Sequence, residues 1–462
     1  MLLCDEEVMA FNQNQFELDC PKIVLTPQDS KKMPLHGIGS IFQRSDGQMH
    51  FKIYASLPGG PKSTLSLLAQ NATLPGQIIP ENEFYNLKAT DAWGRVWESQ
   101  KTDFDSHSFP QTNFVTLKGS IESLSYKIVA IKKPQIRNYL KLLFYQTVNL
   151  PANSAIKRSV SVANQMRSSS IKLNAWKFQS NDCQFILWDD EGILSLDCYA
   201  LKEGTTFPSY FDLRVVEAMR FITAEPLSWS LMESEKDGVS EITLKSKVTK
   251  KSLTRLMPPV EYNRITQAKE AQTLFDLYLQ HIKSYSAPHW HPISQRLSAI
   301  LNASAGSLET EGLTLGVEIE GLVKQELANR FHIPLCKVVL KKVCNAIATL
   351  SMDENIKKRI IGFVGSMAGA KGQDILKELC NKGIIKETLF EKWKCLRNPS
   401  AHADVLNPSK IQEYFDLCHA NIVLIYHLIF YIIGYRGIYT NYQQHGFPKA
   451  LYNHPLSDQP HA

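Results

Sequence analysis

An arginine, an asparagine and a histidine lie close together in the C-terminal third of the chain, in the stretch Arg397-Asn-Pro-Ser-Ala-His402. A guanidinium group binds phosphate oxygens in a bidentate manner and does not lose its proton. An imidazole takes up or releases a proton near neutral pH. These residue types suit RNA cleavage by attack of a ribose 2′-hydroxyl on the adjacent phosphate. His402 would handle the proton, and Arg397 would stabilise the charge on the pentavalent phosphate.

The residues around this stretch predict a bend between two helices. Apolar residues at helical spacing predict a helix over 387–397. Pro399 disfavours helical geometry at the residue before it, so we expect Arg397 at the end of this helix and Asn398 as its cap. Asn398 would orient the scissile group or hold the loop.

The next helix is expected to begin at Asn407 and Pro408, because asparagine is common at the N-cap and proline at the first helical position. Arg397, Asn398 and His402 would then surround one bend and converge on one ligand. No cluster of carboxylates accompanies them in the sequence, which argues against a two-metal nuclease. We therefore expect neither a metal nor a cofactor.

Length and composition indicate a protein of two or three domains. The chain has 462 residues, 44% hydrophobic residues and a formal charge of +6, from 51 basic and 45 acidic residues. This mild basic excess permits nucleic-acid binding without requiring it. The nine cysteines are odd in number and contain no CxxC pair, which is typical of reduced thiols. The N-terminus is acidic, whereas a secretory signal begins with basic residues. Together with the reduced thiols, this predicts a cytoplasmic protein.

The apolar patterns predict an α+β, multidomain protein. Residues 1–257 are β-rich, with two subdomains as one option and a break near 130–150. Residues 184–188 and 193–200 form a hairpin pattern around a glycine-containing turn. Residues 261–437 have helical periodicity and predict an all-α domain, and 438–462 predict a loose tail.

Two segments leave a choice of structure. Residues 135–145 are compatible with a short helix. Residues 417–435 contain no Asp, Glu, Lys or Arg and approach the length of a membrane span, but His419, Asn421 and His427 interrupt them. We expect a buried helix or one packed at a subunit interface, and no stable membrane association.

The stretch Arg397-Asn-Pro-Ser-Ala-His402 resembles the Arg-Asn-x-x-x-His motif of HEPN domains, which are small helical ribonuclease and nucleotide-binding domains. The order of a β-rich region and a helical domain is similar to that of ApeA-like anti-phage proteins. Residues 194–210 and 393–402 resemble that family most. The resemblance implies an all-α HEPN-type C-terminal domain and a homodimer through it, in which two motifs face one shared cleft across a two-fold axis. The apolar run 422–433 would contribute to that packing.

The resemblance also directs attention to acidic residues near the motif. HEPN domains often carry a polar or acidic residue on an earlier helix, so Glu320 is a candidate for orienting Arg397, with Glu318 beside it. The alternative is a solvated helix face. Asp404 either tunes His402 by hydrogen bonding or merely lies in the turn.

A basic run precedes the boundary near residue 257. Its lysines are candidates for contacts with an RNA backbone, and a solvated strand and linker is the alternative. The candidate residues are Lys245, Lys247, Lys250 and Lys251.

The sequence thus predicts a metal-independent endoribonuclease whose β-rich region has a sensing or regulatory role. In the family it resembles, such proteins act in abortive infection against phage. The expected partners are RNA, with tRNA as one candidate, a second copy of the chain, and a phage-derived trigger of unknown kind. Two alternatives remain open. One is a non-catalytic HEPN module that binds RNA, a nucleotide or a partner protein. The other is a carbohydrate- or protein-binding β domain with a structural helical tail.

Overall fold

The structure is a computed structural model in which contacts divide the chain into two units. The β unit contains Met1–Val148, Ala152–Pro208 and Leu227–Lys251, and the helical unit contains Asn149–Pro151, Ser209–Pro226 and Ser252–Ala462. The residues that the structure describes are 2–56, 78–108, 114–129, 138–155, 159–162, 165–168, 174–190, 192–236, 238–247, 256–262, 267–331, 337–366, 371–401 and 408–453.

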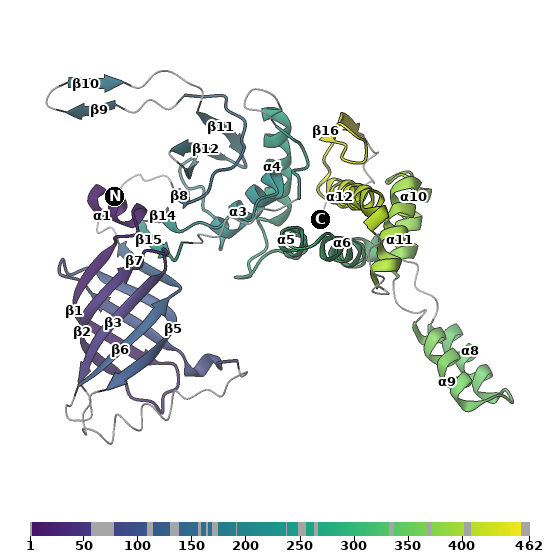
Figure 1. Ribbon diagram of the computed structural model, residues 1–462, viewed down its shortest axis with the longest axis horizontal. Helices are drawn as coiled ribbons and strands as arrows, with labels where there is room; N and C mark the ends of the chain where they lie inside the picture. Colours follow the sequence, from purple (N-terminus) through teal and green to yellow (C-terminus); the bar gives the residue numbers. More distant parts are fainter. Residues whose placement is uncertain are drawn as a thin grey trace. The chain divides into compact units, whose positions relative to one another are not determined.

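A six-stranded barrel forms the first part of the β unit (Figure 1). Its strands follow the hydrogen-bonded order β5-β4-β1-β2-β3-β6, and β6 also pairs with β5, which closes the ring. The strands are β1 (Glu17–Pro27), β2 (Leu35–Gln43), β3 (Met49–Ser56), β4 (Tyr85–Thr90), β5 (Val96–Ser108) and β6 (Phe114–Ile121). The helix α1 (Asp5–Asn12) precedes them, and the 3₁₀ turn η1 (Glu81–Glu83) precedes β4.

Alternation of buried and exposed side chains explains why these segments form a barrel. In β3, Phe51, Ile53 and Ala55 are fully buried, while the residues between them face outward. Gly119 of β6 pairs with Phe51 on one side and with Phe104 on the other. A Cβ atom at Gly119 would lie 2.1 Å from the Asp103 carbonyl oxygen, so glycine permits the close approach that closes the barrel.

The sheet continues beyond the barrel through β7 (Ser123–Val129), which pairs with β5. The further strands follow the order β7-β15-β14-β8-β13-β12-β11. They are β8 (Tyr139–Phe144), β11 (Ala175–Ser180), β12 (Cys183–Asp190), β13 (Ile193–Ala200), β14 (Leu231–Lys236) and β15 (Val239–Lys245), and β9 (Ser159–Val162) pairs with β10 (Gln165–Ser168) in a separate hairpin. The predicted hairpin is confirmed, since β12 and β13 pair from Cys183↔Ala200 to Asp190↔Ile193.

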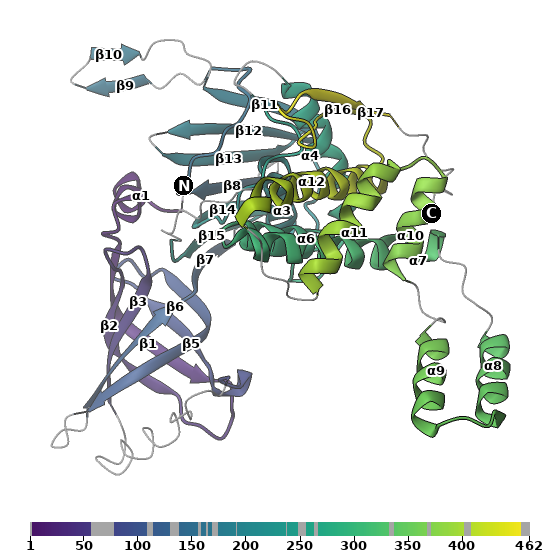
Figure 2. The same ribbon diagram turned by 45° about the vertical axis from the view of Figure 1, so that its right-hand side comes forward.

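The helical unit is built around α12 (Ile411–Ile433), in which every residue from Cys418 to Ile433 is buried. The views in Figures 1 and 2 show α6 (Leu308–Leu322) and α11 (Glu387–Ala401) beside it, and these three helices contact one another. The other helices are α3 (Phe211–Thr223), α4 (Ala268–Ile282), α5 (Pro292–Ser304), α7 (Ala328–Phe331), α8 (Lys337–Thr349), α9 (Glu354–Ser366) and α10 (Gly372–Asn381). The π-helical turn η2 (Val323–Leu327) extends α6. The 3₁₀ turn η3 (Pro408–Lys410) precedes α12.

One helix of this unit comes from the β-rich part of the sequence. Arg214 and Glu217 of α3 are fully buried and form an ion pair of 2.8 Å. The Ser294 hydroxyl of α5 donates to the Glu217 carboxylate at 2.7 Å, which ties α3 to the helices that follow residue 257. A buried ion pair needs such added partners to offset its desolvation. Segment Ser209–Pro226 therefore belongs to the helical unit, although the sequence places it before the expected boundary.

The prediction of a β-rich N-terminal region followed by a largely helical C-terminal region is confirmed. Two local expectations need correction. Within 135–145, residues 139–144 form the strand β8 between β13 and β14. Part of the expected loose tail is folded: β16 (Gly437–Thr440) and β17 (Lys449–Tyr452) form a hairpin, and the Tyr452 hydroxyl donates to the His427 carbonyl of α12 at 3.1 Å.

Candidate functional site

Arg397 lies within α11, four residues before the helix ends at Ala401. The expectation that Arg397 ends the helix and Asn398 caps it is wrong, because the helix continues through Pro399. Proline removes the hydrogen bond to the carbonyl of Cys395, four residues earlier. Cys395 is an exposed residue of this helix. Packing of the preceding turns against α6 then outweighs the local preference of the proline.

Two side chains of α11 bring it close to α6. The Trp393 indole is 1% exposed and donates its Nε1–H to the Gly316 carbonyl of α6 at 3.1 Å. Arg397, one turn later, lies directly over Gly316, where an added Cβ atom would be 3.4 Å from the Arg397 Cα and Cβ atoms. Glycine at this position thus lets the backbones approach and places Arg397 over the same face of α6 as Glu320.

Glu320 contacts the Arg397 guanidinium directly. The Arg397 Nε and Nη2 atoms donate to one carboxylate oxygen, Oε2, at 3.2 and 3.1 Å. The other oxygen, Oε1, accepts a hydrogen bond of 2.6 Å from Lys324 Nζ. Burial alone would raise the pKa of Glu320, but the hydrogen bonds and charges of Lys324 and Arg397 outweigh it and lower that pKa. Glu320 is therefore an anion shared by two cations.

The Glu320 side chain is itself held in place by α10. A Cβ atom at Gly372, the first residue of α10, would lie only 2.5 Å from the Glu320 Cγ atom, so the glutamate stem packs closely on that residue. The Arg397 side chain remains 43% exposed. An ion pair this exposed contributes about 0–1 kcal/mol to stability. Its main physical effect is to fix the direction of an arginine that is open to solvent.

Glu318 does not join this group. Its carboxylate accepts a hydrogen bond of 2.8 Å from Arg296 Nη1 of α5, and it therefore links α5 to α6. Of the two glutamates considered in the sequence, only Glu320 is brought to Arg397. Sequence reasoning missed Lys324, although its spacing of four residues from Glu320 in a helix is a recognised ion-pair signal.

Some residues of the motif lie outside the part of the chain that the structure describes. Asn398 lies on α11, and its side chain is not described. His402 and Asp404 fall in 402–407, outside the described residues, as do Lys250 and Lys251. The expected start of the last helix at Asn407 and Pro408 is close, since Pro408 begins η3 and α12 follows at Ile411.

The prediction that Lys247 contacts RNA needs correction, because this lysine is buried in the β unit. Its ammonium group donates to the carbonyls of Phe11 and Asn12 at 2.6 and 3.0 Å, at the end of α1, and to Asn14 Oδ1 at 2.8 Å. Burial lowers the pKa of Lys247 to about 8. Cations stabilise helix C-termini, so Lys247 has a structural role there. The Lys245 ammonium lies 3.6 Å from the centre of the Trp229 ring.

The apolar part of α12 is the core of its own unit. Ile425 and Ile429 are 1% and 0% exposed within the single chain, so the first of the two expectations, a buried helix, is observed, and the run 422–433 offers no free surface for packing at a subunit interface. Among the described helices, α12 is the one long and apolar enough to cross a membrane, and 89% of its most apolar window is buried in the fold. Core helices of soluble proteins have the same property.

Within the described residues, no group of three or more histidine, cysteine or acidic side chains is arranged to hold a metal ion. The arrangement around Arg397 suits recognition of a phosphate: an oriented guanidinium, open to solvent, near the end of α11 and five residues before His402 in the sequence. Comparisons of the chain with models of protein families, with curated proteins and with solved structures find no match.

Proposed function

We propose that the helical unit is a metal-independent endoribonuclease of the HEPN type. The observation that supports this most is the exposed Arg397 guanidinium, oriented by Glu320 and positioned five residues before His402. In the reaction, the 2′-oxygen of a ribose bonds to the adjacent phosphorus while the bond to the 5′-oxygen breaks. His402 accepts the proton of the 2′-hydroxyl, and the leaving 5′-oxygen takes up a proton from water. The products are a 2′,3′-cyclic phosphate and a 5′-hydroxyl.

Arg397 would stabilise the charge that develops on the pentavalent phosphate. A guanidinium whose direction is already fixed needs little reorganisation when that charge appears. Glu320 supplies this fixation, and Lys324 shares its negative charge, so the three groups together retain a net positive charge. The site therefore attracts a phosphate rather than repelling it.

The biological setting that we propose is anti-phage defence by abortive infection. Cleavage of RNA, with tRNA as one candidate substrate, would arrest translation in the infected cell. The β unit would restrain the nuclease, leaving only slow basal cleavage, until a phage-derived trigger appears. Two copies would pair through the helical unit so that their motifs share one cleft. Because 422–433 is buried within the subunit, the exposed surface around α11 is the better candidate for that pairing.

Incubation of the purified protein with total RNA in excess EDTA tests this proposal. Protein and RNA are used at equal, micromolar concentrations, so that a slow single turnover is detected. We expect fragmentation that EDTA does not reduce, because the residues invoked need no metal. Loss of fragmentation in EDTA would contradict the proposed mechanism. Retention of RNA on filters without fragmentation would instead favour a non-catalytic module that binds RNA.

A further inference from the structure

A cavity of about 570 Å³ lies in the β unit, between α1, the start of β1 and the turn that joins β4 to β5. This volume is within the range of roughly 300–1,000 Å³ that small ligands and single anchoring side chains occupy. Its lining residues all belong to the β unit, whereas Arg397 belongs to the helical unit. The residues that line it are Cys4, Glu6, Glu7, Ala10, Gln15, Phe16, Glu17, Trp93 and Arg95.

Trp93 is the most unusual residue of this lining, because its side chain is 83% exposed. It lies in a turn that is held by Asp91, whose Oδ1 atom accepts hydrogen bonds from the backbone N–H groups of Trp93 and Arg95 at 3.0 and 2.9 Å. Gly94 has a φ of +80°, a left-handed conformation that glycine adopts without strain. The turn is thus fixed, and it presents a large indole to solvent.

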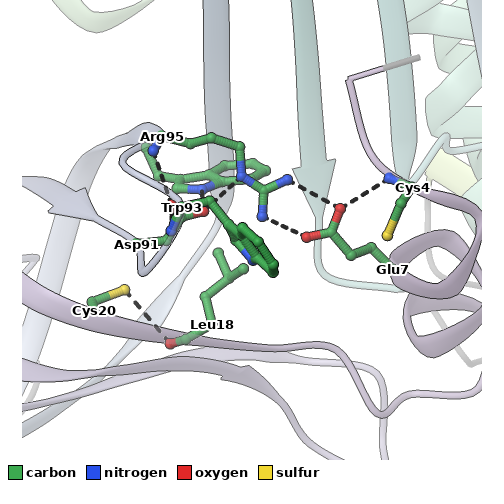
Figure 3. Close-up of polar contacts among 8 residues, drawn as sticks. Cys4, Glu7, Leu18, Cys20, Asp91, Trp93 and Arg95 are labelled. Atoms are coloured by element: carbon green, nitrogen blue, oxygen red, sulfur yellow. Dashed lines mark hydrogen bonds and ion pairs between the residues drawn. The ribbon is translucent and has the colours of Figure 1, made fainter.

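The one cation of the lining is already neutralised. Arg95 Nε donates to Asp91 Oδ2 at 2.7 Å, and Arg95 Nη1 donates to Glu7 Oε2 at 3.0 Å; Figure 3 shows the guanidinium between these two carboxylates. The hydrogen bonds that Arg95 donates to Glu7, and then those to Asp91, raise the pKa of Arg95, and their effect outweighs that of burial, which lowers it. The guanidinium therefore offers little attraction to an anionic ligand.

The same contacts give the cavity a rigid wall. Glu7 belongs to α1 and also accepts a hydrogen bond of 3.0 Å from the Cys4 backbone N–H, at the start of that helix. Because Glu7 binds Arg95 at the same time, α1 is tied to the turn that carries Trp93. A site formed before its ligand arrives loses less conformational entropy on binding.

Two carboxylates of the lining remain exposed. Glu6 on α1 and Glu17 at the start of β1 are both exposed side chains. The charged residues of the lining are three glutamates and one arginine, so the cavity carries an excess of negative charge. An exposed indole beside unneutralised carboxylates has the chemistry that binds ammonium and guanidinium groups, through cation–π contact and ion pairing.

We propose that this cavity binds a basic peptide segment of a protein partner, with a lysine or arginine side chain inserted against Trp93. The Glu6 and Glu17 carboxylates would balance its charge. An acidic ligand would be repelled by these carboxylates, so the charge of the lining favours a basic one. This inference goes beyond the proposed nuclease: it concerns the β unit, and binding there requires no RNA cleavage. It gives the β unit a chemically defined class of partner.

Fluorescence anisotropy with the full-length protein and a fluorescein-labelled hexa-arginine peptide tests the proposal. Wild type should bind this peptide and not a labelled hexa-glutamate peptide. Trp93→Ala should weaken binding about tenfold, which corresponds to about 1.4 kcal/mol, because the variant loses the cation–π contact. Since Trp93 is exposed, this variant should melt like wild type.

A charge-matched pair of double variants separates the cavity from general attraction. Glu6→Gln with Glu17→Gln should weaken binding of the hexa-arginine peptide, and Trp93→Phe should bind better than Trp93→Ala. Glu122→Gln with Glu203→Gln removes the same charge from exposed side chains outside the lining and should leave affinity unchanged. The proposal is overturned if Trp93→Ala binds like wild type, if both double variants weaken binding equally, or if hexa-arginine does not bind.

Discussion

Replacement of Arg397 or of His402 by alanine is expected to lower the rate of RNA cleavage by about 100-fold or more. Loss of a single fixed group that stabilises transition-state charge typically reduces turnover about 10²–10³-fold, and loss of a general acid–base typically about 10²–10⁴-fold. Arg397→Ala should leave the fold intact, because the Arg397 side chain is 43% exposed and its ion pair with Glu320 contributes little to stability. Single-turnover cleavage of a labelled RNA, with thermal melting of each variant, measures both effects.

Matched variants of the same residue types serve as controls. Arg330→Ala removes an exposed arginine from α7, and His445→Ala removes an exposed histidine from the segment between β16 and β17. Both controls should cleave RNA at the rate of the wild type. If Arg397→Ala and His402→Ala cleave as fast as these controls, neither residue takes part in the reaction. If Arg397→Ala melts well below wild type, its role is structural.

Truncation of Trp393 to alanine is expected to lower the free energy of unfolding by roughly 3–5 kcal/mol, the usual range for a buried tryptophan. Trp393 is 1% exposed, its ring lies beside that of Phe390, and its indole N–H satisfies the Gly316 carbonyl. The substitution leaves a cavity between α6 and α11 and removes the side-chain hydrogen bond that joins the two helices. Urea unfolding followed by circular dichroism measures the change.

The loss of stability caused by Trp393→Ala should be distinguishable from the loss of cleavage caused by Arg397→Ala. Trp393→Ala should lose cleavage together with stability, whereas Arg397→Ala should lose cleavage alone. Trp93→Ala, at an exposed tryptophan of the β unit, is the matched control and should change stability by less than about 0.5 kcal/mol. A Trp393→Ala protein that unfolds at the same urea concentration as wild type would show that α6 and α11 are not held together as described.

The sequence predicted the division into β-rich and helical regions because each kind of element has its own apolar period. The hairpin of β12 and β13 was predicted for the same reason, with a glycine turn between two alternating runs. The strand β8 was mistaken for a helix: Leu140, Leu142, Leu143 and Phe144 are all buried, and a short run that is apolar apart from Lys141 has no distinctive period. Closure of the barrel also requires β3 to pair with β6, from Met49↔Ile121 to Ser56↔Phe114, and these contacts join residues distant in sequence.

The candidate site was predictable only in part. Residue types around Arg397 indicated phosphate chemistry, and Glu320 was considered as its partner. Which of Glu318 and Glu320 reaches the arginine depends on how α6 is rotated against α11 and α5, and this rotation is set by packing. Lys247 has the same local pattern as a solvated lysine. Its burial at the end of α1 follows from a contact between residues more than 230 positions apart, which local sequence does not report.

Cleavage of one short RNA that differs only at its scissile ribose tests the central claim most directly. After the preferred cleavage position is mapped, the RNA is made again with a 2′-O-methyl group on that ribose. We expect wild-type protein in EDTA to cut the unmodified RNA to a 2′,3′-cyclic phosphate and to leave the methylated position intact, because the methyl group removes the attacking hydroxyl. Equal cleavage of the two RNAs at that position would contradict the mechanism assigned to Arg397 and His402.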